Sequence, residues 1–337
     1  MKAMDRIDAA QKHFKPTSVA VATFKKFSED KSTTLAATIA FWGFFSIFPL
    51  FLVLVTVLGW VLPASDKENV LKHVASMFPL LDTSSITGLT GAIWPLILGL
   101  ATALWSGIGA VRTVQNAFNS VWEIPYHERP GILEQVGRSL FVLVTVGAGL
   151  VISTLITGFV TSNSTGVDLG VAGRILGFAI SIALDVGLFV AAFRLLTDRD
   201  ITTRDVLPGA IFSGIVFFIL QEASAFIISR HLKSAQPTYG HFATVITILW
   251  WFYLQSVLTL LGAQLNVVLK EGLYPRSIVK APQTEADHRV LQAYAAERTY
   301  QPEEQVRARV DRGGQENGEA ATGPPAATGP PAAGDGS

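Results

Sequence analysis

The chain has 337 residues, of which only 15% are charged, whereas about 25% are charged in an ordinary soluble protein. The mean hydropathy of +0.41 therefore favours an all-α integral membrane protein over a soluble globular one. A net charge of zero gives no overall field for nucleic acid, and the absence of cysteine excludes disulfides, thiolate metal ligands and thiol nucleophiles.

Residues 1–33 are expected to form a cytoplasmic, amphipathic N-terminal segment. They contain seven Lys and Arg residues and no apolar signal-peptide core, so the first hydrophobic segment should act as an uncleaved anchor. Within this segment, 17–29 has an amphipathic helical pattern. Its apolar residues would lie on the membrane surface while Lys25 and Lys26 face the lipid headgroups. An ordinary solvated helix explains the same pattern equally well.

Six segments are long and apolar enough to cross a bilayer, which needs about 20 residues each. These expected spans are 34–62, 92–111, 138–161, 173–197, 206–229 and 241–269. The first contains Pro49, which should kink the helix because proline removes a backbone donor and clashes with the preceding turn. The outer connection 63–91 and the start of the inner connection 112–137 have further amphipathic or helical character.

The placement of Lys and Arg predicts the orientation of this 34–270 transmembrane domain. Basic residues concentrate in the N-terminal segment, the second and fourth connections and the region after the last span, and this excess is typical of the cytoplasmic side. Both termini should therefore be cytoplasmic. The tail, 271–337, is charged and weakly helical over 284–310, and its Gly-, Ala- and Pro-rich composition predicts disorder from about 311.

Ionisable residues inside a membrane are costly, at about 3 kcal/mol each, and are therefore functional candidates. Asp185 lies near the centre of 173–197, behind a face of small residues at four-residue spacing. A buried carboxyl in a packing seam and a place on a substrate or proton path explain it equally well. Glu222, in the outer half of 206–229, could bind a proton or cation, pair with a basic group, or face a water-filled vestibule.

The last span carries a polar stripe that includes Gln255 and Asn266 on one helical face. Interhelical hydrogen bonding explains such a stripe, and the lining of a cavity is the alternative. Arg112, just past the second span, either binds a lipid phosphate or snorkels to the interface. Together, Asp185, Glu222, Gln255, Asn266 and Arg112 form the candidate substrate or proton path.

The chain lacks the common enzymatic and nucleotide-binding motifs. Its six histidines have no metal-ligand spacing, and the sequence has no phosphate-binding loop and no GxSxG element. No basic surface with interleaved aromatic residues suggests RNA binding. We therefore expect no enzymatic activity, cofactor, metal or nucleic-acid partner.

Four stretches resemble the YihY/BrkB family of bacterial inner-membrane proteins, which includes YhjD-type members. The matching elements are Ser46-x-x-Pro49 in 35–59, the Trp105-Ser106 and Val111-Arg112 pairs in 103–124, Asp205-x-x-Pro208-Gly209-Ala210 in 193–217, and Tyr239-Gly240 with Gly262-Ala263-x-Leu265-Asn266 in 238–269. The resemblance covers about residues 25–270. One departure is Gln264, where the family often has Glu.

The resemblance implies a six-helix inner-membrane protein with both ends in the cytoplasm. Family members have been linked to transport of lipid or lipopolysaccharide precursors, and some were labelled as ribonucleases, which nothing in these residues supports. The expected function is a transporter or flippase-like protein for a lipid or amphipathic envelope substrate. The alternative is a non-transporting scaffold or envelope assembly factor. Membrane lipids are the expected partners, and the small-residue faces permit a homo-oligomer.

Overall fold

The computed structural model describes residues 2–61, 93–131, 133–142, 144–145, 170–239, 242–278, 283–301, 303, 304 and 306. Throughout this described part the regular structure is helical and no strand occurs, so the all-helical prediction is confirmed there. The predicted connection 63–91, most of the predicted span 138–161 and the tail from 307 lie outside the described residues.

The helices follow the apolar runs and the charged ends of the sequence. In chain order they are α1 (Lys2–His13), α2 (Lys15–Glu29), α3 (Ser32–Val61), α6 (Ile93–Val121), the short 3-10 helix η1 (Tyr126–Glu128), α8 (Gly170–Leu195), α9 (Thr203–Tyr239), α10 (Phe242–Lys270) and α11 (Glu285–Glu297). Residues 133–142 are also helical.

Four stretches among the described residues are long and apolar enough to cross a membrane. They are Leu96–Val121, Ile175–Leu195, Thr203–Gln221 and Val245–Lys270. The 30 residues of α3 make a helix about 45 Å long, which exceeds the ~30 Å hydrocarbon core, and Ser32–Ile47 is a shorter apolar stretch within it. α3 continues through the buried Pro49, and the kink expected there stays a prediction.

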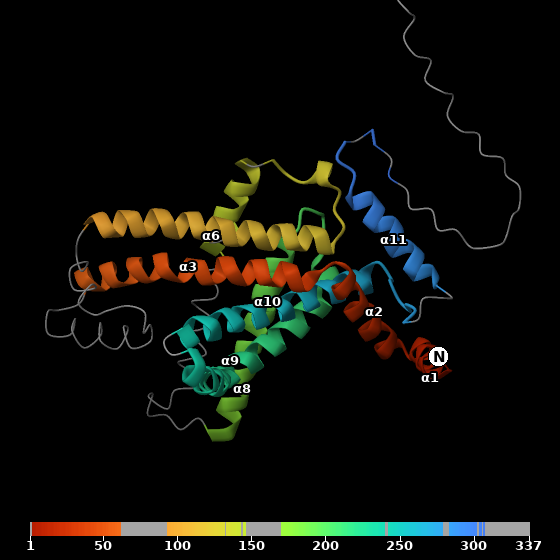
Figure 1. The fold of residues 1–337 in the computed structure, drawn as a ribbon, viewed down its shortest axis with the longest axis horizontal. Helices are drawn as coiled ribbons and strands as arrows, with labels where there is room; N and C mark the ends of the chain where they lie inside the picture. The colour runs from red at the N-terminus through yellow and green to blue at the C-terminus, as the bar shows by residue number, and fades with distance from the viewer. Residues whose placement is uncertain are drawn as a thin grey trace, which may run out of the picture.

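The ends of several helices gather on one side of the bundle (Figure 1). There α3 and α9 begin, α6, α8 and α10 end, and α1, α2 and α11 pack around them. We call this region the polar end. α3 and α6 lie side by side, and α9 packs against both α8 and α10. Fully buried apolar residues such as Phe118, Phe193 and Val267 form the core next to the polar end.

The α9–α10 seam explains why the sequence places small residues there. A Cβ atom on Gly209 would fall 2.0 Å from the Gly262 carbonyl oxygen, so neither helix could approach as closely with a side chain at Gly209. At the same contact the Gly209 amide donates a hydrogen bond to Asn266 Oδ1 at 2.6 Å. At this point the two helices are therefore held by backbone contact and one buried amide.

Candidate functional site

The side chain of Lys26 is completely buried at the polar end. Its ammonium forms an ion pair with Asp30, 2.8 Å away at the C-cap of the same helix, and a second with Glu123, which follows α6. It also lies 5.4 Å from the centre of the Tyr294 ring. A buried charge is very costly unless it is paired, so these three neighbours are what allow Lys26 to stay inside the protein.

Asp30 connects this ion pair to two further helices. Its carboxylate accepts a hydrogen bond from the Tyr294 hydroxyl of α11 at 2.5 Å and one from Gln264 Nε2 of α10 at 2.6 Å. Gln264 Nε2 also lies 3.1 Å from Ser32 Oγ, at the start of α3. We call Lys26, Asp30, Glu123, Gln264 and Tyr294 the central cluster, because groups from four separate parts of the chain meet there.

Burial and the neighbouring charges change the proton affinities in the central cluster. Burial raises the pKa of Glu123 to about 7, although the ammonium of Lys26 opposes this change. Burial disfavours the charged form of Lys26, but the carboxylates of Glu123 and Asp30 outweigh it, so the Lys26 pKa is raised. Burial and the adjacent Asp30 carboxylate also raise the pKa of Tyr294.

The backbone beside the cluster adopts an uncommon conformation. Glu123 has a φ of 46° and Lys31 a φ of 52°, in the left-handed region that residues other than glycine rarely adopt. These residues end α6 and separate α2 from α3, respectively. Such strain is common at functional sites.

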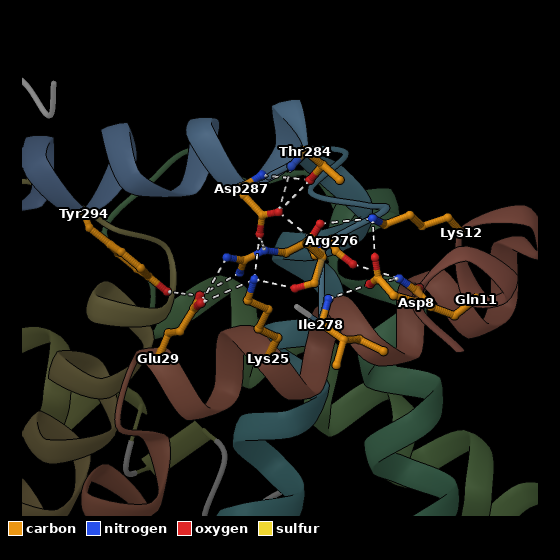
Figure 2. A network of polar contacts seen from close by, with 11 residues as sticks. Asp8, Gln11, Lys12, Lys25, Glu29, Arg276, Ile278, Thr284, Asp287 and Tyr294 are labelled. Carbon is orange, nitrogen blue, oxygen red and sulfur yellow. Dashed lines mark hydrogen bonds and ion pairs between the residues drawn. The ribbon is translucent and has the colours of Figure 1, made fainter. Parts of the chain in front are cut away.

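A second group of charged residues lies alongside, shown in Figure 2, and we call it the outer network. Arg276 donates two hydrogen bonds to Glu29, at 2.7 and 3.1 Å, and a third to Asp287 at 2.9 Å. Lys25 donates to the same Asp287 at 2.8 Å. Asp287 also completes a capping box with Thr284 at the start of α11, so the residue that begins this helix also binds it to α2.

The outer network extends to α1. The Asp8 carboxylate accepts a hydrogen bond from Lys12 at 2.5 Å and one from the Ile278 amide at 2.7 Å, and Gln11 donates to the Arg276 carbonyl at 2.8 Å. The N-terminal helices and the segment after α10 therefore form one polar assembly (Figure 2).

α11 is also joined to the connection after α6. Arg129 forms an ion pair with Glu297 at 2.9 Å, and the rings of Tyr126 and Tyr300 stack with their centres 4.9 Å apart. α11 is thus held on the bundle at both of its ends, by Asp287 near its start and by Glu297 at its end. Of the weak helix expected over 284–310, residues Glu285–Glu297 form α11, and residues 298–301 are not helical.

A cavity of about 780 Å³ lies at the end of α8, and we call it the α8 pocket. Gly187, Val190 and Ala191 line it from the apolar part of the helix, and charged residues line it from the polar end, namely Glu128, Glu134, Arg138, Arg194, Asp198, Arg199 and Asp200. A Cβ atom on Gly187 would meet nothing within 4 Å, so the pocket has room beside the helix. One cavity therefore has both an apolar and a charged wall.

Arg138 fixes the charged wall of this pocket. Its guanidinium pairs with Asp198 and donates to the carbonyls of Leu195 and Thr197 at 2.6 and 2.9 Å, and so satisfies the exposed carbonyls at the end of α8. Asn119 of α6 donates to the same Asp198 at 2.5 Å. Arg194 is held by the Ile201 carbonyl at 3.1 Å.

The described contacts place two of the predicted path residues at different helix junctions. Asn266 bonds Gly209 in the α9–α10 seam, whereas Arg112 donates to Gln135 at 3.0 Å and joins α6 to the helical residues 133–142. Asp185 is buried in α8, and Gln255 is half-buried on α10. Glu222 belongs to α9, but its side chain lies outside the described part of the chain.

The sequence interpretation missed the central cluster and placed one of its members wrongly. Lys26 was expected to face lipid headgroups, but it is buried because two carboxylates are available to pair with it. The four-residue spacing of Lys26 and Asp30 on α2 was an available signal. The position of Glu123 just past an apolar run was a second available signal. Neither signal predicts the contacts with α10 and α11.

Comparison with known proteins gives one family and several relatives. The family model described as virulence factor BrkB matches residues 23–287. The ribonuclease-like protein YfkH of Bacillus subtilis is 23% identical over 263 residues, which cover 73% of this chain and 93% of the relative. A UPF0761 membrane protein of Pseudoalteromonas translucida is 26% identical over 210 residues, covering 60% and 66%.

A UPF0761 membrane protein of Azoarcus is 24% identical over 269 residues, which cover 76% of this chain and 64% of the relative. The chain therefore spans slightly less than two thirds of the length of these two UPF0761 proteins. No solved structure matches. The matched region 23–287 contains every member of the central cluster except Tyr294.

Proposed function

Since the chain belongs to the virulence factor BrkB family of membrane proteins, we propose that it is a bacterial inner-membrane transporter or flippase-like protein for a lipid or another amphipathic envelope substrate. In this proposal the chain crosses the membrane six times, and the polar end faces the cytoplasm with both termini. The basic residues of α2, Arg138, Arg199 and Arg276 all lie at that end, which supports this orientation.

The α8 pocket is the observation that carries the proposal. An amphipathic molecule needs an apolar wall for its chain and polar groups for its head, and this cavity offers both at the end of a candidate span. Its volume of about 780 Å³ lies within the range usual for small-molecule sites. Val190 would contact the apolar part of the substrate, and Arg194 its polar part.

Asp185 takes a second role in the proposed mechanism. It is buried in the same helix, nine residues before Arg194, which is about 14 Å along the helix axis. A carboxyl in a membrane span that can gain and lose a proton would couple the pocket to a proton gradient. Asp185→Asn should then abolish gradient-driven transport while the protein is still inserted at normal levels.

The direct test fills the α8 pocket. Gly187→Leu adds a side chain where a Cβ atom meets open space, so the helix should be preserved while the cavity is blocked. The matched control is Gly137→Leu, since Gly137 is also exposed and unhindered in a helix but does not line the pocket. Transfer of fluorescent phospholipid between leaflets is measured in proteoliposomes. Wild type and the control should transfer lipid, and Gly187→Leu should not.

One observation favours the scaffold alternative. Two of the path residues, Asn266 and Arg112, use polar atoms to join helices. A scaffold would show no lipid transfer in any of these variants and would purify with a stable protein partner. A ribonuclease, which the name of the Bacillus relative suggests for that protein, would instead cleave RNA when purified. Either result would replace the transporter proposal.

A further inference from the structure

A second cavity, the α2 groove, lies between α2 and the α9–α10 pair and has a volume of about 490 Å³. Of the ten residues that line it, only Lys15 and Thr23 are polar, and the Thr23 hydroxyl already donates to the Val19 carbonyl at 2.8 Å. One wall is formed by Leu261, Leu265 and Leu269, which repeat every four residues on one face of α10. The interior of the groove is therefore apolar.

The position of the groove decides what molecule can occupy it. Its leucine wall belongs to the last turns of the candidate span Val245–Lys270, and Phe212, which also lines the groove, belongs to the candidate span Thr203–Gln221. The groove thus lies at the level where a span leaves the bilayer. The molecules that surround the protein at that level are phospholipids, whose acyl chains match an apolar groove.

The charge at the mouth of the groove selects among phospholipids. Lys15 is exposed there, and its ammonium lies 5.7 Å from the centre of the Tyr274 ring. α2 begins at Lys15 after Phe14, which provides no side-chain cap, so the positive end of the helix dipole lies at Lys15 and adds to its charge. An acyl chain in the groove would place its phosphate beside these positive groups.

We propose that the α2 groove is a binding site for an anionic phospholipid of the leaflet at the polar end, with one acyl chain between α2 and α10 and the phosphate at Lys15. This lipid is a bound component that fixes α2 against the spans. The site shares no lining residue with the α8 pocket, so the two proposals can fail separately.

Native mass spectrometry of the full chain in detergent, titrated with phosphatidylglycerol or phosphatidylcholine, tests the proposal. Ala20 lines the groove and is exposed, so Ala20→Trp should fill it and weaken phosphatidylglycerol binding by about tenfold. Ala10→Trp, at an exposed position on α1, is the matched control and should bind as wild type. Lys15→Ala should weaken binding of phosphatidylglycerol by about fivefold, and Lys15→Arg should restore it.

Three results would overturn the site. The first is equal binding of both lipids by the wild type, which would remove the role of charge. The second is equal binding by the Ala20→Trp and Ala10→Trp variants, which would remove the groove. The third is unchanged phosphatidylglycerol binding in Lys15→Ala, which would place the phosphate elsewhere. Lys15 is exposed, so its variants do not depend on repacking of the interior.

Discussion

The candidate spans and the polar end differ in the side chains that they expose and bury. Along the spans, large apolar side chains such as Trp94, Leu98 and Leu176 are more than half exposed, as expected for surfaces that contact lipid. At the polar end, Lys26 and Arg276 are buried among carboxylates. These buried charges hold α2 against Arg276 and α11 at the polar end.

This difference shows which region tolerates change. A lipid-facing side chain is replaceable by any apolar residue. Removal of one partner of a buried ion pair, by contrast, leaves the other charge buried and unpaired, which is costly. The strongest effects of mutation should therefore arise at the polar end, and the span seams should come second.

The largest effect is expected for Lys26→Ala. Removal of this ammonium leaves Asp30 and Glu123 buried together without their counter-charge, which should lower the free energy of unfolding by about 3–5 kcal/mol. The neighbouring Lys25→Ala is the control, because Lys25 is partly exposed and Asp287 keeps Arg276 as a partner. Lys25→Ala should lower the free energy of unfolding by only about 1 kcal/mol.

Chemical unfolding in detergent, followed by tryptophan fluorescence, measures both changes. Equal losses for Lys26→Ala and Lys25→Ala would contradict the contrast between buried and partly exposed pairs at the polar end.

The pH dependence of stability should report on Glu123. Its pKa is 4.5 when unperturbed and about 7 in the folded protein, so the folded state holds the proton more tightly. Glu123 therefore makes its full contribution to the free energy of unfolding below pH 4.5. This contribution is lost as the pH rises through 7, and the total change is up to about 3 kcal/mol. Asp287 does not interfere, because its pKa is lowered and its contribution is lost only in strong acid.

Thermal unfolding of wild type in detergent should accordingly shift to lower temperature between pH 5 and pH 8, and Glu123→Gln should flatten this slope. Glu285→Gln changes an exposed carboxyl at the start of α11 and should leave the slope as it is. A Glu123→Gln profile parallel to that of wild type would show that Glu123 does not hold a proton near neutral pH.

Four of the six expected spans coincide with candidate spans among the described residues, because the signal for each is local. α8 at Gly170–Leu195 and α10 at Phe242–Lys270 lie within three residues of the expected 173–197 and 241–269. An apolar run of this length has no other stable place than a membrane helix. α9 instead continues to Tyr239, well past the expected 229, because a helix can extend beyond its apolar part.

The central cluster was not predictable, because its contacts are not local. Gln264 and Asp30 are 234 residues apart, and Tyr294 reaches Asp30 across 264. Charge patterns in the sequence show that such residues exist, but only the approach of α2, α10 and α11 pairs them. The polar residues of the spans were predictable in part. The stripe that contains Asn266 predicted either a contact between helices or the lining of a cavity, but it did not identify Gly209 as the partner of Asn266.

The smallest effect belongs to the seam itself. Gly209→Ala would place a methyl group 2.0 Å from the Gly262 carbonyl oxygen, so α9 and α10 must separate and the 2.6 Å bond from the Gly209 amide to Asn266 must lengthen. The expected loss is about 1–3 kcal/mol, as for overpacking of a core. Gly137→Ala, where a Cβ atom meets nothing within 4 Å, should be neutral or slightly stabilising. Because the groups that Gly209 contacts, the Gly262 carbonyl and the Asn266 side chain, carry no charge, the loss in Gly209→Ala should also be the same at pH 5 and pH 8, unlike the Glu123 effect. A loss that varied with pH would mean that the change at the seam also alters the pKa of a group at the polar end.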